Sequence, residues 1–195
     1  MTSLETALRQ IHHDLTDARV SFALVGGLAV SARTDPRFTR DADLAVALAS
    51  DAEAEHLIHR LRDCDYRVEA VVEQEAIGRL ATVRLTRSDV PRAPVVDLLF
   101  ASSGIEPEVV AEAEPLDLLP NLRMGIARTG HLMALKVLSR DDVTRPQDLV
   151  DLRALLRVAP SDELARARRA LTLIAARGYG RGRDLMEDLD RLVGS

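Results

Sequence analysis

Two aspartates, Asp41 and Asp43, lie just before an apolar run in the stretch VGGLAVSARTDPRFTRDADLAV (residues 25–46). In a strand, residues i and i+2 point to the same face, so both carboxylates can converge on one point. Asp97 interrupts the otherwise apolar run APVVDLLF (residues 93–100), where an unpaired carboxylate is costly to bury. If the two strands are neighbours, three carboxylates meet at one sheet edge. They then form the oxygen-only environment that Mg²⁺ prefers, which holds one or two ions for phosphoryl chemistry.

A pair of glycines, Gly26 and Gly27, precedes the acids and lies between a predicted strand and a predicted helix. Small residues at such a junction let a phosphate approach the backbone, and the amides at the helix N-terminus can donate hydrogen bonds to it. Taken alone, a glycine pair is usually a tight turn, and an Asp-x-Asp pair at a strand start is usually a turn or capping device. The full combination, with Asp97 inside an apolar run, instead favours a site for a phosphate and a metal ion.

The periodicity of apolar residues and the turn signals predict the elements that must position these side chains. Helices are predicted over residues 3–19, 27–34 and 49–63, with Ser50 or Asp51 capping the third, and over 129–140, 146–157, 161–177 and 181–193. Strands are predicted over 21–26, 42–48, 66–72, 80–87 and 93–100, with loops, a short helix and at most one edge strand over 101–123. A mixed α/β part, residues 1–127, and an all-helical part, residues 128–195, together predict an α+β fold.

The composition is that of an ordinary globular protein and argues against several classes of function. With 3% aromatic residues and no Trp, a base-stacking surface is not expected to be the main device, and a net charge of −5 provides no global basic field for nucleic acid. Cys64 is the single cysteine, which fits a reducing compartment. The longest nearly apolar run, residues 22–30, is far shorter than the ~20 residues of a membrane span. We therefore expect a cytoplasmic protein that does not enter a membrane.

The motifs resemble a known family. The pattern GG-x13-DAD, followed by VVDLLF, resembles the nucleotidyltransferase fold of the DNA polymerase beta superfamily. MALKVLSR and RPQDLVDL resemble the third and fourth motifs of the AbiEii-type nucleotidyltransferases, toxins of type IV toxin–antitoxin systems, so the resemblance covers residues 20–157. It implies a polymerase beta-like core, a mixed sheet flanked by helices, over residues 1–127 and a C-terminal helical lobe over 128–195.

The resemblance also implies a reaction and its participants. An NMP would move from an NTP substrate to a hydroxyl acceptor, plausibly the 3′ end of an RNA such as tRNA, with release of pyrophosphate. The cofactor would be Mg²⁺ (or Mn²⁺), and a cognate antitoxin is a possible partner.

Carried over to this sequence, the resemblance assigns roles to five site residues. Asp41 and Asp43 would be metal ligands, and Asp97 would complete the metal site or act as a base. Lys136, the single lysine of the chain, would neutralise the triphosphate, and we expect its loss to impair NTP binding with little effect on stability. Asp148 would be the acid of the fourth motif.

Three further residues, Arg40, Arg140 and Asp151, lie near these five in the sequence. Arg40, directly before Asp41, and Arg140, one turn after Lys136, are predicted to bind the nucleotide together with Gly26 and Gly27. Asp151 shares a helix face with Asp148, where its charge suits the helix dipole.

Two alternatives stay open at this point. Many members of the family carry Gly-Ser at the turn, whereas the second position here is Gly27, which leaves contact with the terminal phosphates to backbone amides alone. Aminoglycoside and lincosamide nucleotidyltransferases carry a similar glycine pair and acid pair, so a small-molecule acceptor is the second hypothesis. The third is a non-catalytic nucleotide-binding module, against which the intact set of acids argues.

Overall fold

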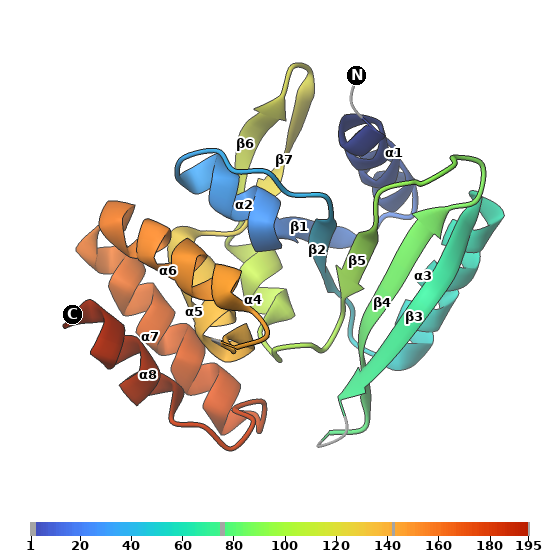
Figure 1. Cartoon of the computed structure of the whole chain (residues 1–195). Helices are drawn as coiled ribbons and strands as arrows, with labels where there is room; N and C mark the ends of the chain where they lie inside the picture. Colours follow the sequence, from blue (N-terminus) through green and yellow to red (C-terminus); the bar gives the residue numbers. More distant parts are fainter. Residues whose placement is uncertain (1–2, 75–76, 142, 195) are drawn as a thin grey trace.

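A computed structural model describes residues 3–74, 77–141 and 143–194, which form one mixed sheet with helices packed around it (Figure 1). The strands are β1 (Ser21–Val25), β2 (Ala42–Ala47), β3 (Tyr66–Gln74), β4 (Arg79–Arg87), β5 (Val96–Leu99), β6 (Glu114–Leu119) and β7 (Leu122–Ile126). The helices are α1 (Ser3–Asp17), α2 (Gly26–Arg33), α3 (Asp51–Asp63), α4 (Glu106–Ala111), α5 (Thr129–Ser139), α6 (Pro146–Val158), α7 (Ser161–Ala176) and α8 (Leu185–Val193). The predicted α+β fold is confirmed.

The strand order brings together segments that are far apart in the sequence. The order is β3-β4-β5-β2-β1-β7-β6, in which β2 pairs with β5 and β1 with β7 in parallel, and the other neighbours are antiparallel. The two strands that carry the predicted acids, β2 and β5, are therefore neighbours at the centre of the sheet, as the sequence required for one shared site.

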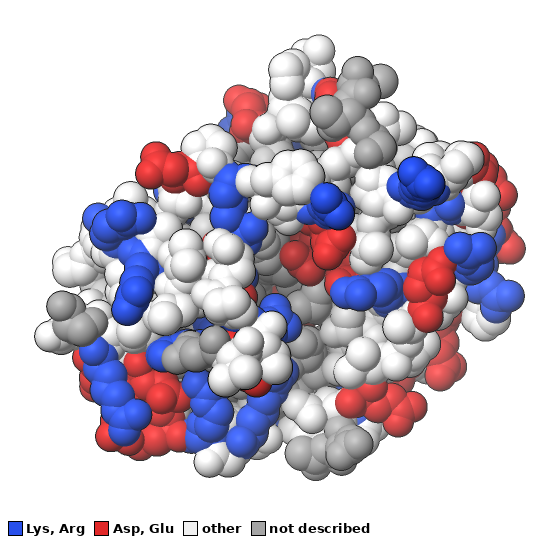
Figure 2. Space-filling model, viewed as in Figure 1, with Lys and Arg blue, Asp and Glu red and all other residues white. Residues whose placement is uncertain are grey.

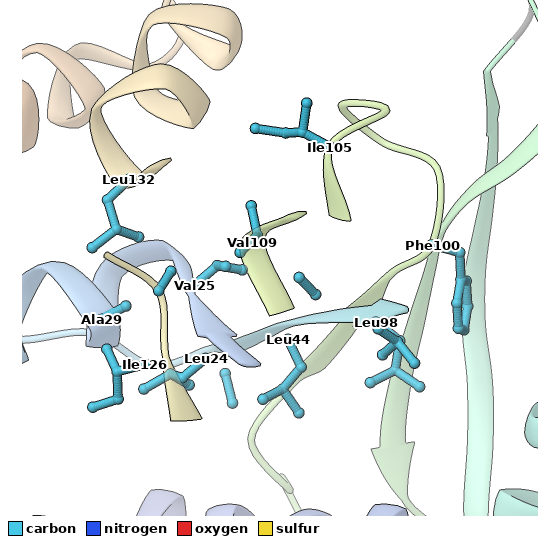
Figure 3. Close-up of a cluster of buried hydrophobic side chains, with 14 of the residues drawn as sticks. Leu24, Val25, Ala29, Leu44, Leu98, Phe100, Ile105, Val109, Ile126 and Leu132 are labelled. Atoms are coloured by element: carbon cyan, nitrogen blue, oxygen red, sulfur yellow. The ribbon is translucent and has the colours of Figure 1, made fainter. Parts of the chain in front are cut away.

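The register of the central strands sends the acids to one face of the sheet. Leu44 lies opposite Leu24 of β1 and Leu98 of β5, and Figure 3 shows these three side chains together on one side of the strands. Because side chains alternate along a strand, Asp43 and Asp97 point to the opposite face. Ile105, Val109 and Leu132 lie on that other side (Figure 3), so both faces are covered by apolar side chains and the acids lie at the border of the core.

The helical C-terminal part packs beside the sheet and brings a second set of polar residues to it. Helix α5 contacts α2, α6, α7 and α8, and its start is fixed to α7 by a hydrogen bond of 2.6 Å from the Gly130 amide to the Glu163 carboxylate. Figure 1 shows α5 and α6 beside α2, the helix that follows the glycine pair. Among the described helices, none is long and apolar enough to cross a membrane.

Three segments differ from the expectations in instructive ways. The strand predicted over 93–100 spans Val96–Leu99. The helix predicted from 181 begins at Leu185, because Arg181 and Gly182 adopt positive φ angles of 56° and 69° and the Asp184 side chain caps the helix. In the segment predicted as loops with at most one edge strand, α4 precedes a hairpin, β6–β7. The tight turn of this hairpin contains Asn121, with φ 59°.

Candidate active site

A cavity of about 550 Å³ opens where the sheet meets the helical part. Figure 2 shows a hollow at the centre of this face, with acidic side chains gathered on one wall and basic side chains around it. The loop before β2, the β1–α2 turn, β4, β5, α5, α6 and the α7–α8 loop all contribute to the lining. The structure brings most of the predicted site residues to this cavity: Gly26, Gly27, Asp41, Asp43, Asp97, Lys136 and Asp148.

The glycine turn packs closely against two side chains, Gly26 against Asp43 and Gly27 against Arg37. Gly26 has φ +64°, and a Cβ built on it would lie 1.9 Å from Oδ2 of Asp43. The Gly27 amide donates a hydrogen bond to the Asp43 carboxylate. A Cβ on Gly27 would in turn lie 2.7 Å from the Arg37 guanidinium. The two glycines therefore make room for the carboxylate and for an arginine that the sequence analysis did not select.

The electrostatic environment of Asp43 favours a bound cation. Burial raises the pKa of this carboxyl, and the negative charges of Asp97 and Asp41 raise it further, to about 6. The positive charge of Lys136 and the Gly27 amide offset only part of this. Negative charge is thus concentrated at the ends of β2 and β5, and the donors are carboxylate oxygens, the ligands that hard divalent cations prefer. The carboxylates of Asp41 and Asp43 have the donor chemistry that a divalent metal ion requires, and metal binding by them stays a prediction.

Asp97 has a partner of its own. It lies opposite Asp43 in the parallel β2–β5 pair and opposite Arg84 in the antiparallel β4–β5 pair. Arg84 donates two hydrogen bonds to its carboxylate, from Nε to Oδ1 at 2.9 Å and from Nη2 to Oδ2 at 2.7 Å. Within the described ranges, no three His, Cys, Asp or Glu side chains form a group arranged to hold a metal ion. The role of Asp97 as a third metal ligand or as a base therefore stays a prediction.

Lys136 is buried, and two buried carboxylates hold its ammonium group. Nζ lies 2.7 Å from Oδ1 of Asp148 and 2.9 Å from Oδ2 of Asp151. The side chains of Ser139 and Arg145 donate to the other oxygen of Asp148, at 3.0 and 2.8 Å. From the motifs, we expected the loss of this lysine to leave the stability little changed. Its burial between two carboxylates predicts a loss of stability instead, because each carboxylate would lose one of its counter-ions.

Asp151 joins this cluster to the first part of the chain. Arg37, in the loop between α2 and β2, donates from Nε and Nη2 to the two Asp151 oxygens, both at 2.7 Å, and Gln147 donates at 3.1 Å. Burial acts to raise the pKa of Asp151, but the hydrogen bonds from Arg37 and Lys136 outweigh it and hold that pKa below its ordinary value. We call Arg37, Lys136, Asp148 and Asp151 the buried ion cluster.

The two predicted nucleotide-binding arginines lie elsewhere. Arg40 is exposed, with its guanidinium 5.4 Å from the centre of the Phe38 ring, and it is Arg37 and Thr39 of the same loop that line the cavity. Arg140 follows the last residue of α5, where its carbonyl accepts a hydrogen bond of 3.1 Å from Arg183, and the described lining of the cavity does not include it. Nucleotide binding by these two arginines stays a prediction.

Several charged residues that line the cavity were not among the predicted site residues. Arg84 alternates with the fully buried Val83 and Leu85, so an arginine flanked by apolar residues in a strand was the available signal. Arg37 was one of several arginines in its loop, and nothing in the sequence set it apart. Arg181 lay in a segment predicted to be the start of a helix.

The fold is one that solved structures of nucleotidyltransferases share. Three solved structures share the fold. An antigenic nucleotidyltransferase-like protein from Paracoccidioides brasiliensis has 18% identity and a TM-score of 0.57, covering 96% of this chain and 92% of that one. The lincosamide antibiotic adenylyltransferase LnuA has 14% identity and a TM-score of 0.52, covering 80% and 98%. The third, ANT(2'')-Ia in complex with adenylyl-2''-tobramycin, has 15% identity and a TM-score of 0.50, covering 99% and 98%.

The family follows from the sequence itself. The model of the family described as nucleotidyl transferase AbiEii toxin, type IV TA system, matches residues 12–193, and the chain belongs to this family. The resemblance seen in its motifs is confirmed, and the chain is a nucleotidyltransferase of a toxin family. Nucleotidyltransferases generally use divalent metal ions, in agreement with the carboxylates of Asp41 and Asp43. No curated protein matches the chain at the sequence level.

The contact between Gly26 and Asp43 gives a first testable prediction. Gly26→Ala should lower the free energy of unfolding by clearly more than Gly78→Ala, measured by urea denaturation. Both glycines have φ +64°, so both substitutions carry the backbone cost of about 1–2 kcal/mol, but nothing lies within 4 Å of a Cβ at Gly78. Equal losses in the two variants would contradict the close packing of Gly26 on Asp43.

A second prediction concerns the buried ion cluster. Lys136→Met should lower the free energy of unfolding by about 3–5 kcal/mol, because each of two buried carboxylates loses a charge-assisted hydrogen bond and keeps only its arginine partner. Arg153→Met, on the exposed face of α6, is the matched control and should change it by less than about 0.5 kcal/mol. Urea denaturation of both variants measures the difference. A Lys136→Met protein as stable as the control would contradict the stabilising role of this lysine.

The pH dependence of the same cluster gives a third prediction. Because the folded-state pKa of Asp151 lies below its ordinary 3.8, the stability that this carboxylate contributes is present above about pH 4 and is lost as the pH falls below that value. The difference in unfolding free energy between the wild type and Asp151→Asn should therefore be constant from pH 7 to 5 and shrink below pH 4. A difference that grew on acidification would contradict the sign.

Proposed function

We propose that the protein is a toxin that transfers an NMP from an NTP to a terminal hydroxyl of an RNA, with the 3′ end of a tRNA as acceptor. The observation that carries the transfer chemistry is the β2–β5 register, which sets Asp43 opposite Asp97 beside the glycine pair in one cavity. Membership of the type IV toxin family supports the toxin role and a cognate antitoxin as partner.

In this proposal the acceptor oxygen attacks the α-phosphorus, and the bond to the bridging oxygen breaks, so that pyrophosphate leaves. Magnesium ions held by Asp41 and Asp43 would supply charge neutralisation on the phosphates and a lower pKa for the acceptor hydroxyl. The carboxylate of Asp97, when Arg84 releases it, is the group that can take the hydroxyl proton. Amides of the glycine turn that are not used by Asp43 would donate to the phosphates. Residues 1–127 would thus carry the catalytic acids, and residues 128–195 would close the far side of the cavity.

The surface beside the cavity supports an RNA acceptor. Phe38 is 80% exposed, although it lies between two residues that line the cavity, Arg37 and Thr39. The guanidinium of Arg40 lies over its ring. An exposed aromatic ring with an arginine beside it provides one stacking position for an unpaired base and a cation for the neighbouring phosphate.

A small-molecule acceptor is the second candidate, and a specific observation favours it. Two structures with this fold are named as a lincosamide adenylyltransferase and as ANT(2'') in complex with adenylyl-tobramycin. A cavity of about 550 Å³ also lies in the range of drug-sized sites. A non-catalytic nucleotide-binding module is a third possibility, disfavoured because such a module has no use for Asp97 as a buried acid beside Asp43.

The experiment incubates the protein with total RNA, MgCl₂ or MnCl₂, and each radiolabelled NTP in turn, beside parallel reactions with aminoglycosides and lincosamides. Transfer of label to one RNA size class supports the proposal. Label on a small molecule alone supports the second candidate, and binding of an NTP without transfer in any reaction supports the module.

Asp41→Asn and Asp43→Asn give the fourth prediction. Each should lower the transfer rate by at least about 100-fold, because the metal ligands contribute several kcal/mol of transition-state stabilisation. Each variant should be at least as stable as the wild type in the presence of a chelator, because one of several clustered negative charges is removed. The exposed Asp117→Asn is the matched control and should transfer at the wild-type rate. Near wild-type rates in both active-site variants would contradict the assignment.

A further inference from the structure

The loop between α7 and α8, residues 177–184, is fixed to the body of the protein before its central arginine. Tyr179 is buried, and its ring lies so close to Gly104 that a Cβ there would be 2.4 Å from two ring atoms. Arg177 donates to the Gly104 carbonyl and to the Glu108 carboxylate. This half of the loop is therefore held against the segment that follows β5.

The second half of the loop is fixed to α5 and α8. Arg183 donates to the carbonyls of Leu138 and Arg140, at 3.3 and 3.1 Å, and its Nε and Nη2 donate to the Asp188 carboxylate at 3.1 and 2.7 Å. Arg181 lies between the two anchored halves with φ 56°, in the left-handed region that residues other than glycine seldom occupy. The contacts of Arg177 and Tyr179 on one side and of Arg183 on the other hold Arg181 in this conformation.

Arg181 lines the cavity from the helical part of the chain, whereas Asp43 and Asp97 line it from β2 and β5. The other four cations of the described lining each have a carboxylate partner. Arg84 binds Asp97, and Arg37 binds Asp151. Lys136 binds both Asp148 and Asp151, and Arg145 binds Asp148. Arg181 has no carboxylate partner in the part of the chain that the structure describes.

The surroundings of Arg181 disfavour its positive charge. Arg181 is exposed as a residue, but partial burial of its guanidinium lowers its pKa, and the neighbouring positive charges of Arg145 and Arg183 lower it further. An arginine keeps its charge under these conditions, since a guanidinium is too basic to lose its proton in a protein. Three guanidinium groups thus gather on the helical side of the cavity, two with acidic partners and one without. A bound anion would relieve this repulsion, and a planar guanidinium matches phosphate oxygens in pairs.

We propose that Arg181 binds the polyphosphate chain of the nucleotide substrate. This inference rests on the proposed nucleotidyl transfer and gives Arg181 the task that the sequence analysis gave to Lys136, whose ammonium group is already bound by two aspartates. The polyphosphate lies between the acids, which attract cations, and Arg181, which attracts the phosphate oxygens. The loop needs no rearrangement to present the guanidinium, because both of its halves are anchored.

The test measures binding by isothermal titration with inorganic tripolyphosphate, with the NTP that the labelling experiment identifies, and with a short single-stranded RNA, all in MgCl₂. Arg181→Gln should raise the dissociation constants of tripolyphosphate and of the NTP by about tenfold or more. Arg181→Lys should restore part of the loss, and binding of the RNA should stay unchanged. Arg169→Gln, an exposed arginine on α7 outside the described lining, is the matched control and should bind all three as the wild type does.

The outcomes separate this inference from the proposed function. If wild type transfers nucleotide and Arg181→Gln binds tripolyphosphate as tightly as wild type, the inference is wrong and the proposed function stands. If Arg181→Gln loses affinity for RNA instead of tripolyphosphate, Arg181 contacts the acceptor backbone, and the inference is again wrong. A wild type that binds neither tripolyphosphate nor any NTP overturns both. Thermal unfolding of Arg181→Gln should match the wild type, which excludes loss of the fold as the cause.

Discussion

The carboxylate of Asp43 lies against Gly26 and accepts a hydrogen bond from the Gly27 amide. A second acid, Asp97, lies opposite it on the adjacent strand. The contact with Gly26 demands a residue without a side chain and with positive φ at position 26. The parallel β2–β5 pairing separately sets Asp97 next to Asp43. Burial raises the pKa of Asp43, and repulsion from the charges of Asp97 and Asp41 raises it further. The same repulsion is what makes the site favourable for a divalent cation.

The buried ion cluster solves a different problem, which is how the helical part is kept in register with the sheet. Arg37 comes from the loop before β2, Lys136 from α5, and Asp148 and Asp151 from α6, so three elements meet in one set of charge-assisted hydrogen bonds. Such a cluster gains little net stability over apolar packing, but removing one member is costly, so it specifies one arrangement of the elements. The motifs MALKVLSR and RPQDLVDL therefore fix the wall of the cavity.

The sequence predicted the elements and the acids well because both leave local signals. Alternation of apolar residues identified the central strands. The capping pattern offered Ser50 or Asp51, and it is the Ser50 side chain that accepts a hydrogen bond from the Glu53 amide at the start of α3. A carboxylate inside an apolar run identified Asp97. The partners of these charges were not predictable, since the pairs Arg37–Asp151 and Arg84–Asp97 depend on strand order and helix packing. An excess of arginines in the sequence, with a single lysine, also hid which of them face the cavity.

The cavity therefore has acids on its sheet side and cations on its helical side, an arrangement that no local sequence pattern predicts. Its sheet side carries Asp41, Asp43 and Asp97, with one arginine bound to the last of these, and its helical side carries cations of which all but Arg181 are neutralised by acids within the chain. In the proposed complex a nucleotide polyphosphate would complement both sides at once, because its oxygens can bind both metal ions and a guanidinium. The chain as a whole has a net charge of −5, so this complementarity is built locally. Since the buried ion cluster and the anchored α7–α8 loop both hold the helical side in place, the distance between the two charged walls is set by the fold before any substrate binds.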